Sequence, residues 1–245
     1  MLLCGSFVPR THARRRRGSA GGHPPVRRKT VRHRAGRRLF RTPRQGRCGI
    51  ARALARALED PDLRSCAAAN LRLAGALEPL KLALQSPQPE VRAAAARELG
   101  AFQKIELLEP LSRAARDENA LVASNALAGL SRYQDPAAVP YLAALAKTGG
   151  MIGDMSLDRL VQLDPAAALA VARVLLSSTQ VPDQLYAMRV VGAFGNASDL
   201  PQLRQIAAAR PGDLNQRNRG FGLMPPINLA RAAQIAVDGI ASRSQ

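Results

Sequence analysis

Hydrophobic residues beyond residue 49 recur with the spacing of amphipathic helices. In the segment "PEVRAAAARELGAF" they follow one another at intervals of four, four and three positions: Val91, Ala95, Leu99 and Phe102. This spacing places them on one face of a helix with 3.6 residues per turn. The next segment, "ELLEPLSRAAR", repeats the pattern, and Gly100 stands where the first helix is expected to end. The pattern therefore predicts two short helices in succession.

The pair of helices recurs about every 31 residues. The segment "RELGAF" at Arg97–Phe102 returns as "RVVGAF" at Arg189–Phe194, 92 residues later. Large apolar or aromatic residues stand at intervals of 31, 30 and 31: Phe102, Tyr133, Leu163 and Phe194. We expect these four, with Leu99 and Leu130, to be the core anchors of the repeats. Proline-led segments such as "VPYLAA" mark a second helix start in each period, because proline fits the first turn of a helix.

This repetition predicts a solenoid. Two short amphipathic helices cannot bury their apolar faces alone, whereas stacked copies of the pair cover one another. The expected fold class is all-α, an α-α superhelix of about five to six helix pairs over residues 49–245. The repeats are clearest in "LEDPDLRSCAAANL", "QSPQPEVRAAAARELG", "GLSRYQDPAAVPYLAAL" and "RVVGAFGNASDLPQL". These segments resemble short HEAT-like repeats, an armadillo-type α-solenoid that is also found in phycobilisome-lyase-related proteins.

The resemblance implies polar links between neighbouring repeats. In such repeats an acid and an arginine near the start of the first helix often join adjacent units. Two pairs fit this pattern: Asp62 with Arg64, and Glu90 with Arg92. Later units depart from it, since Asp183 is followed by glutamine, and we expect them to depend on apolar contacts. The segment after Leu71 is also shortened, which predicts an imperfect first junction.

Two further segments interrupt the repeat. The glycine-rich "TGGMIGDMS" at Thr148–Ser156 lacks the Gly-Lys-Ser/Thr ending of a phosphate-binding loop, so we expect a flexible loop between repeats. Residues 210–226 form a second, longer loop before a final helix at Leu229–Ile240. Long loops in compact domains are often functional. Two interpretations of this loop stay open: its Arg217, Arg219 and Phe221 contact a partner, or its apolar residues cap the last repeat.

The positive charge is concentrated in the first 50 residues. Of the net charge of +18, residues 1–50 contribute 15 basic residues and no acid. Residues 51–245 hold the other 21 of the 36 basic residues against 18 acids, a net of +3. We expect residues 1–48 to be a disordered Arg-rich tail. Three interpretations stay open: an arm that neutralises nucleic-acid phosphates, a targeting segment, or translated sequence that is not native protein.

The chain offers little catalytic chemistry. All three histidines lie in the tail, and the three cysteines form no CxxC motif: His12, His23, His33, Cys4, Cys48 and Cys66. We therefore expect no disulfide framework, no metal site, no cofactor and no catalytic site in the body. No apolar run approaches the ~18 residues of a membrane span, and no usable signal peptide is present, which favours a cytoplasmic location.

Our leading functional hypothesis is a non-catalytic protein–protein interaction scaffold. In a solenoid, the second helices of the repeats are expected to line a concave surface for a protein partner. The candidate contact residues on these helices are Arg113, Arg116, Tyr141, Lys147, Gln202 and Arg204. Two alternatives remain: an accessory to a chromophore-lyase-type or other enzyme activity, and nucleic-acid binding through the basic tail. The resemblance to HEAT-type di-iron hydroxylases does not extend to their His-Glu ligand pairs, since the body has no histidine.

Overall fold

The computed structural model describes residues 43–208 and 228–243 of the chain. Most of the predicted tail and the predicted loop at 210–226 lie outside these ranges, and so do Arg217, Arg219 and Phe221. The chain divides into two compact units, Met1–Gly49 and Ile50–Gln245. Helix α1 (Pro43–Ala57) begins five residues before residue 48, the expected end of the tail.

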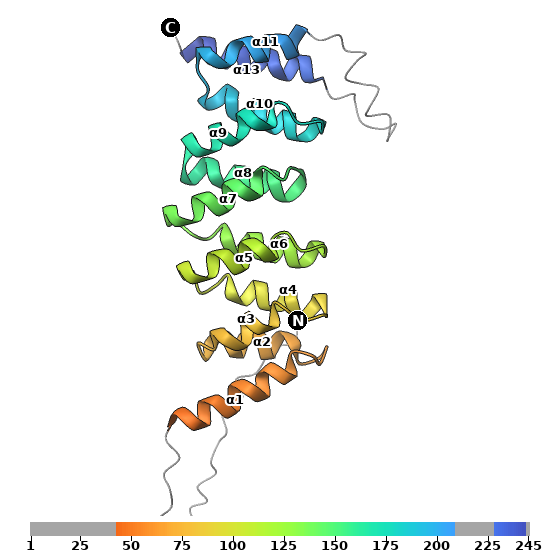
Figure 1. Cartoon of the computed structure of the whole chain (residues 1–245), viewed down its shortest axis with the longest axis vertical. Coiled ribbons are helices and arrows are strands. Elements are labelled where there is room, and N and C mark those ends of the chain that lie inside the picture. Colours follow the sequence, from red (N-terminus) through yellow and green to blue (C-terminus); the bar gives the residue numbers. More distant parts are fainter. Residues whose placement is uncertain (1–42, 209–227, 244–245) are drawn as a thin grey trace, which may run out of the picture. The chain divides into compact units, whose positions relative to one another are not determined.

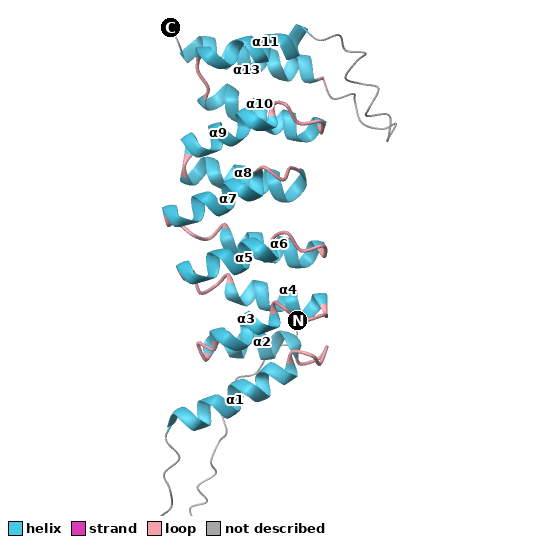
Figure 2. Ribbon diagram, viewed as in Figure 1, coloured by secondary structure: helices cyan, strands magenta, loops and turns pink. Residues whose placement is uncertain are grey.

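The second unit is a stack of helix pairs, and the predicted all-α fold is confirmed (Figure 1). Figure 2 shows helices joined by short loops, with no strand in the described ranges. The α-helices after α1 are α2 (Arg64–Leu73), α3 (Leu77–Ala83), α4 (Pro89–Leu99), α5 (Leu108–Ala114), α6 (Ala120–Leu130), α7 (Val139–Ala146), α8 (Gly150–Leu163), α9 (Pro165–Leu175), α10 (Val181–Phe194), α11 (Leu200–Ala208) and α13 (Leu229–Arg243). Three short 3-10 helices precede α5, α7 and α11: η1 (Ile105–Leu107), η2 (Pro136–Ala138) and η3 (Ala197–Asp199).

Two rows of helices result from this pairing. The first-helix row contains α2, α4, α6, α8, α10 and α13, and the second-helix row contains α3, α5, α7, α9 and α11. Helix α13 packs against both α10 and α11, as α6 packs against both α4 and α5. Each helix of the second-helix row packs against the first-row helix that follows it, as α7 packs on α8 and α9 on α10, so contacts are made mainly between neighbours along the chain, as in a repeat protein.

Local capping residues explain where several helices begin. The side chain of Asn119 accepts hydrogen bonds from the backbone N–H groups of Leu121 and Val122 at the start of α6. Asp164 caps α9 in the same way, and Pro165 occupies its first turn. These groups satisfy backbone donors that have no partner within the helix. The proline-led segments of the sequence thus begin helices as predicted.

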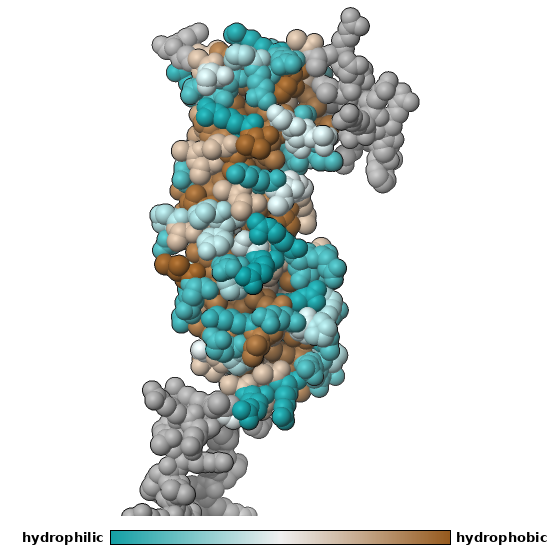
Figure 3. Space-filling model, viewed as in Figure 1, coloured by the Kyte–Doolittle hydropathy of each residue, from teal (hydrophilic) through white to brown (hydrophobic). Residues whose placement is uncertain are grey.

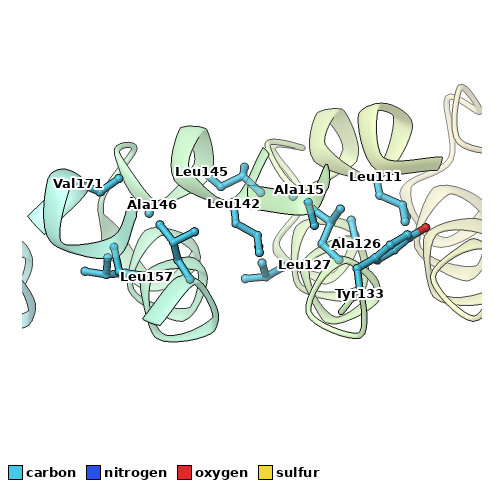
Figure 4. Packing of buried hydrophobic residues seen from close by; sticks show 14 of the residues in the cluster. Leu111, Ala115, Ala126, Leu127, Tyr133, Leu142, Leu145, Ala146, Leu157 and Val171 are labelled. Carbon is cyan, nitrogen blue, oxygen red and sulfur yellow. The ribbon is translucent and has the colours of Figure 1, made fainter. Parts of the chain in front are cut away.

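Leucine and alanine fill the space between the rows. Figure 4 shows Leu127 of α6 and Leu142 of α7 among the buried residues of this core, and neither side chain is exposed to solvent. Among the predicted anchors, Leu99, Leu130 and Tyr133 are buried in the core. Two others are partly buried and pack against it: Phe102 and Leu163. Small residues between leucines allow these short helices to pack closely.

Phe194 is the exception, and its prediction as a core anchor was wrong. Its side chain is 43% exposed. Helix α4 ends at Leu99, so Phe102 lies in the turn that folds back over the core. Helix α10 continues through Phe194 itself, and the helical position directs this ring outward. An equal spacing in sequence therefore produced two different environments.

The two phenylalanines provide a test of this difference. Phe102→Ala should destabilise the protein by about 2 kcal/mol, less than the 3–5 kcal/mol of a fully buried phenylalanine. Phe194→Ala should cost under about 1 kcal/mol, since surface substitutions remove few contacts. Urea unfolding followed by circular dichroism would measure both. Equal losses in the two variants would restore Phe194 as a core anchor.

Polar links join the repeats along the whole stack, so the expectation that later repeats depend on apolar contacts was wrong. Arg173 of α9 donates to both carboxylate oxygens of Asp199 at 2.8 and 3.0 Å. In an earlier repeat Arg92 donates to Asp117 at 2.7 and 2.9 Å, and Glu90 is not its partner. In each pair the hydrogen bond from arginine is the main cause that lowers the pKa of the aspartate. The partners are 25 or 26 residues apart, beyond the reach of a local sequence pattern.

The glycine-rich segment is also different from the prediction. Residues 150–156, expected as part of a flexible loop, form the first turns of α8. Gly149 and Gly150 have φ angles of +70° and +64°, which glycine adopts without strain. Asp183 of the next repeat accepts a hydrogen bond from the N–H of Gly150 at 2.9 Å. A cap supplied from 33 residues away starts this helix, and the local sequence gives no sign of it.

Candidate partner-binding surface

Six of the nine residues predicted to bind a partner are among the described residues, and they lie in or just after three helices of the second-helix row. Three of the six are already held by intramolecular hydrogen bonds: Arg113 pairs with Glu109, Arg116 bonds to Ser112, and Gln202 bonds to Ser177. Tyr141 is half-buried and packs against the core. Lys147 and Arg204 are exposed. The structure therefore places these residues in and just after α5, in and just after α7, and in α11.

Large exposed apolar side chains are more numerous on the first-helix row, although Leu82 of α3 and Val174 of α9 are also exposed. Hydrophobic residues reach the surface among hydrophilic ones in the view of Figure 3. On the first-helix row, from α6 to α13, the large exposed ones are Leu121, Met151, Met155, Phe194 and Ile235. Met151 is 62% exposed and Ile235 is 63% exposed. Patches of exposed apolar surface commonly mark interaction sites.

Two cavities lie on either side of α10, at the C-terminal end of this row. The first, of about 420 Å³, opens between α8 and α10 and is lined by Asp158, Val161, Gln162, Arg189, Val190, Ala193 and Phe194. The second, of about 330 Å³, opens between α10 and α13 and is lined by Leu185, Met188, Arg189, Gly192, Ala193, Ala232, Ile235, Ala236 and Gly239. Arg189 and Ala193 line both cavities and form the ridge between them. We call the two cavities and this ridge the α10 groove.

Differences in the distance between neighbouring helices explain why a cavity lies between α8 and α10. A Cβ atom on Gly100 would lie 2.4 Å from the Cα of Gly129, so α4 and α6 are in backbone contact. A Cβ atom on Gly192 would lie 2.9 Å from the Cα of Ala236, so α10 and α13 are similarly close. In the repeat register, the position of Gly100 and Gly192 is occupied in α8 by Val161, which lines the first cavity. A branched side chain at this position keeps the neighbouring backbone at a distance.

One ion pair crosses the first cavity. Arg189 of α10 forms a salt bridge with Asp158 of α8, and its guanidinium lies 4.8 Å from the centroid of the Tyr186 ring. Stacking on an aromatic ring holds a guanidinium in a fixed position. The groove therefore combines apolar walls with a polar pair whose position is fixed by α8 and α10.

A second carboxylate lies one turn before this pair. Asp154 has one carboxylate oxygen, Oδ1, that is buried and accepts no hydrogen bond. Burial, followed by the nearby charges of Asp183 and Asp158, raises the pKa of Asp154 to about 6, and Arg189 opposes this shift. Asp183 is only 5% exposed and is held by hydrogen bonds from the Gly150 N–H and the Ser178 hydroxyl.

The raised pKa of Asp154 predicts a pH-dependent stability. The folded state binds the proton more tightly than the unfolded state, whose aspartate has a pKa near 3.8. This contribution to the free energy of unfolding is therefore full below pH 4 and is lost as the pH rises through about 6. Asp154→Asn should remove this slope and stabilise the protein at pH 7 by about 1 kcal/mol, after allowance for partial exposure to solvent. Urea unfolding between pH 4 and pH 7 measures it, and an unchanged slope in the variant would contradict the assignment.

The described residues carry few other chemical sites. Within residues 43–208 and 228–243 there is no group of three or more His, Cys, Asp or Glu side chains placed to hold a metal ion. In the same part of the chain, no helix has the length and apolarity to cross a membrane.

Comparison with known proteins finds HEAT repeats in part of the chain. Residues 77–150 match the HEAT repeats family, so the predicted resemblance to HEAT-like repeats is confirmed there, without support for the lyase type. No curated protein matches the chain. Among solved structures, a designed armadillo repeat protein is 16% identical, with 81% of this chain and 94% of that chain covered and a TM-score of 0.35. An engineered protein is 21% identical, with 83% of this chain and 94% of that chain covered and a TM-score of 0.35. A designed armadillo repeat protein in complex with the peptide (KR)4 is 17% identical, with 82% of this chain and 95% of that chain covered and a TM-score of 0.34.

Proposed function

We propose that this chain of HEAT-like repeats is a non-catalytic scaffold that binds a protein partner through the α10 groove. The observation that carries the proposal is the pair of adjoining cavities on either side of α10, next to the exposed side chains of Phe194 and Ile235. Protein interfaces concentrate their binding energy in a few large side chains that fill such pockets. A solenoid also presents a broad surface on which a partner segment can lie.

This proposal moves the binding surface from the second-helix row to the first-helix row. The groove also has three polar residues, Asp158, Gln162 and Arg189. Their side chains can orient a bound segment, because hydrogen bonds at fixed positions provide specificity. The apolar residues around them supply the area that must be removed from water. Residues of the second-helix row then become the natural comparison, because they were expected from the sequence to contact the partner.

Selection of peptides against the full chain tests the proposal. A phage-displayed library of short random peptides is selected on the immobilised protein, and enriched peptides are measured by fluorescence anisotropy. Ile235→Glu places a charge at the second cavity and should weaken their binding at least tenfold. The matched control is Lys147→Glu with Arg204→Glu, two exposed changes on the second-helix row that should leave binding unchanged. Circular dichroism and thermal unfolding check that each variant is folded.

The outcomes of this selection are distinct. Loss of binding in the Ile235 variant alone supports the groove. Loss in the Lys147 and Arg204 variant alone would place the partner on the second-helix row and overturn the proposal. The proposal would also be overturned if selection on the wild-type protein enriched no peptide more strongly than selection on the Ile235→Glu protein.

A further inference from the structure

We propose that the α10 groove selects a peptide segment with two large apolar side chains and a lysine or arginine on the side of α8. This inference rests on the proposed function and adds the chemistry of the partner. It follows from the spacing of the two cavities and from the uneven distribution of charge around them.

The spacing of the cavities determines how the two apolar side chains are separated. One cavity lies on each side of α10, so their centres are about one helix spacing apart, roughly 8–10 Å. An extended chain covers this distance in about three residues, at roughly 3.3 Å per residue. A helix covers it in about six or seven residues, at 1.5 Å per residue. A segment with large apolar residues at either spacing can therefore fill both cavities at once.

Negative charge is in excess at the α8 end of the groove. Asp158 lines the first cavity and pairs with Arg189, and the charges of Asp158 and Asp183 both act on Asp154 behind it, so three carboxylates face the single guanidinium of Arg189. The other nearby cation of α8, Arg159, donates to the carbonyl of Tyr133 at 2.7 Å, toward the preceding repeat. A ligand cation close to Asp158 would offset this excess, and partly buried charges are screened weakly by salt.

The other end of the groove has no excess of negative charge, since α13 carries Arg231 and Arg243 against the single carboxylate of Asp238. Arg243 of α13 donates to the carbonyl oxygens of Gly192 and Gly195, at 2.6 and 3.1 Å, where the end of α10 carries partial negative charge. Asp238 accepts a hydrogen bond from Gln234 on the exposed side of α13. Because the imbalance is confined to the α8 end, the cation of the ligand is expected there, beyond the apolar residue in the first cavity. An acidic residue at the same position would face Asp154 and Asp158, with Arg189 already paired.

Matched synthetic peptides test the charge of the partner. Two fluorescein-labelled peptides carry two leucines at the spacing that spans both cavities, and they differ only in having lysine or glutamate at the α8 end. Fluorescence anisotropy with the full chain should give at least tenfold tighter binding of the lysine peptide at low salt. Asp158→Asn should reduce this preference at least threefold. Asp238→Asn, the matched control on α13, should leave it unchanged.

The pH provides an independent readout of the same charge. From pH 7 to about pH 5, protonation of Asp154 removes one negative charge from the α8 end, and its pKa is about 6. The groups that face it are Asp158 on its own helix and Asp183 and Arg189 on α10. Binding of the lysine peptide should weaken several-fold over this interval, and Asp154→Asn should abolish that dependence.

The results separate the two proposals. If the glutamate peptide binds as tightly as the lysine peptide, and Ile235→Glu weakens both, the groove binds a partner and the inferred charge is wrong. If neither peptide binds, or if Ile235→Glu changes nothing, the proposed function of the groove is wrong as well. A lysine preference that survives Asp158→Asn unchanged would also overturn the inference, because the preference would then have another origin.

Discussion

Gly100→Ala should destabilise the protein by about 3 kcal/mol, the upper part of the range for overpacked sites. The new Cβ atom would lie 2.4 Å from the Cα of Gly129, and this neighbour belongs to the backbone. A backbone neighbour cannot move aside as the end of a flexible side chain can, so α4 and α6 must separate. Gly100 has φ −59° and ψ −20°, a conformation that alanine adopts freely, so the whole cost is steric.

Gly49→Ala is the matched control for this substitution. Gly49 lies in α1 with helical neighbours on both sides, and a Cβ atom there would have no neighbour within 4 Å. Alanine should be neutral there or stabilise the helix by roughly 0.5–1 kcal/mol, because it loses less conformational entropy than glycine. Urea unfolding of both variants gives the comparison. A Gly100 variant as stable as the wild type would mean that α4 and α6 are farther apart than described.

Leu142→Ala should cost about 3–5 kcal/mol, the largest loss that we expect from a single truncation. Leu142 has no exposed surface and lies in the middle of the stack, close to Leu127 and Leu145 in Figure 4. The cavity left behind would weaken the contacts of α7 with the helices packed on it. In a repeat protein each unit is stabilised mainly by its neighbours, so damage to a central unit affects both sides.

An exposed leucine serves as the control for this truncation. Leu82 of α3 is 67% exposed, and Leu82→Ala should change the free energy of unfolding by no more than about 0.5 kcal/mol. The same urea unfolding experiment measures both variants. Similar losses at the two positions would show that burial does not determine stability in this stack.

The helices could be predicted from the sequence because their cause is local. The stripe of apolar residues in the last helix was predicted as Leu229, Ala233, Ala236, Val237 and Ile240, and all five are buried. The 3.6-residue spacing identifies the buried residues of this helix correctly because only one face of the helix packs against the core. Tyr133 was placed correctly by the same reasoning, since a turn follows α6 as another follows α4.

The α10 groove could not be predicted in the same way, although the sequence contained one local sign of it. Ile235 lies off the buried stripe of its helix, and a large apolar residue in such a position is the local sign of an exposed contact. Met151 and Met155 were assigned to a loop, because glycines suggested a break where a distant aspartate starts a helix. The ion pair of Asp158 and Arg189 joins residues 31 positions apart, so only the stacking of the repeats reveals it.

The hydrogen bond from Gly150 to Asp183 limits where the chain can be divided. Helix α8 has no side chain of its own at its N-terminus that accepts from the first backbone N–H groups, and the acceptor for Gly150 belongs to α10. A fragment that stops before α10 would lose this hydrogen bond, which caps the start of α8. The smallest part of this protein that keeps this cap of α8 therefore extends at least through Asp183, although α8 itself ends 20 residues earlier, at Leu163.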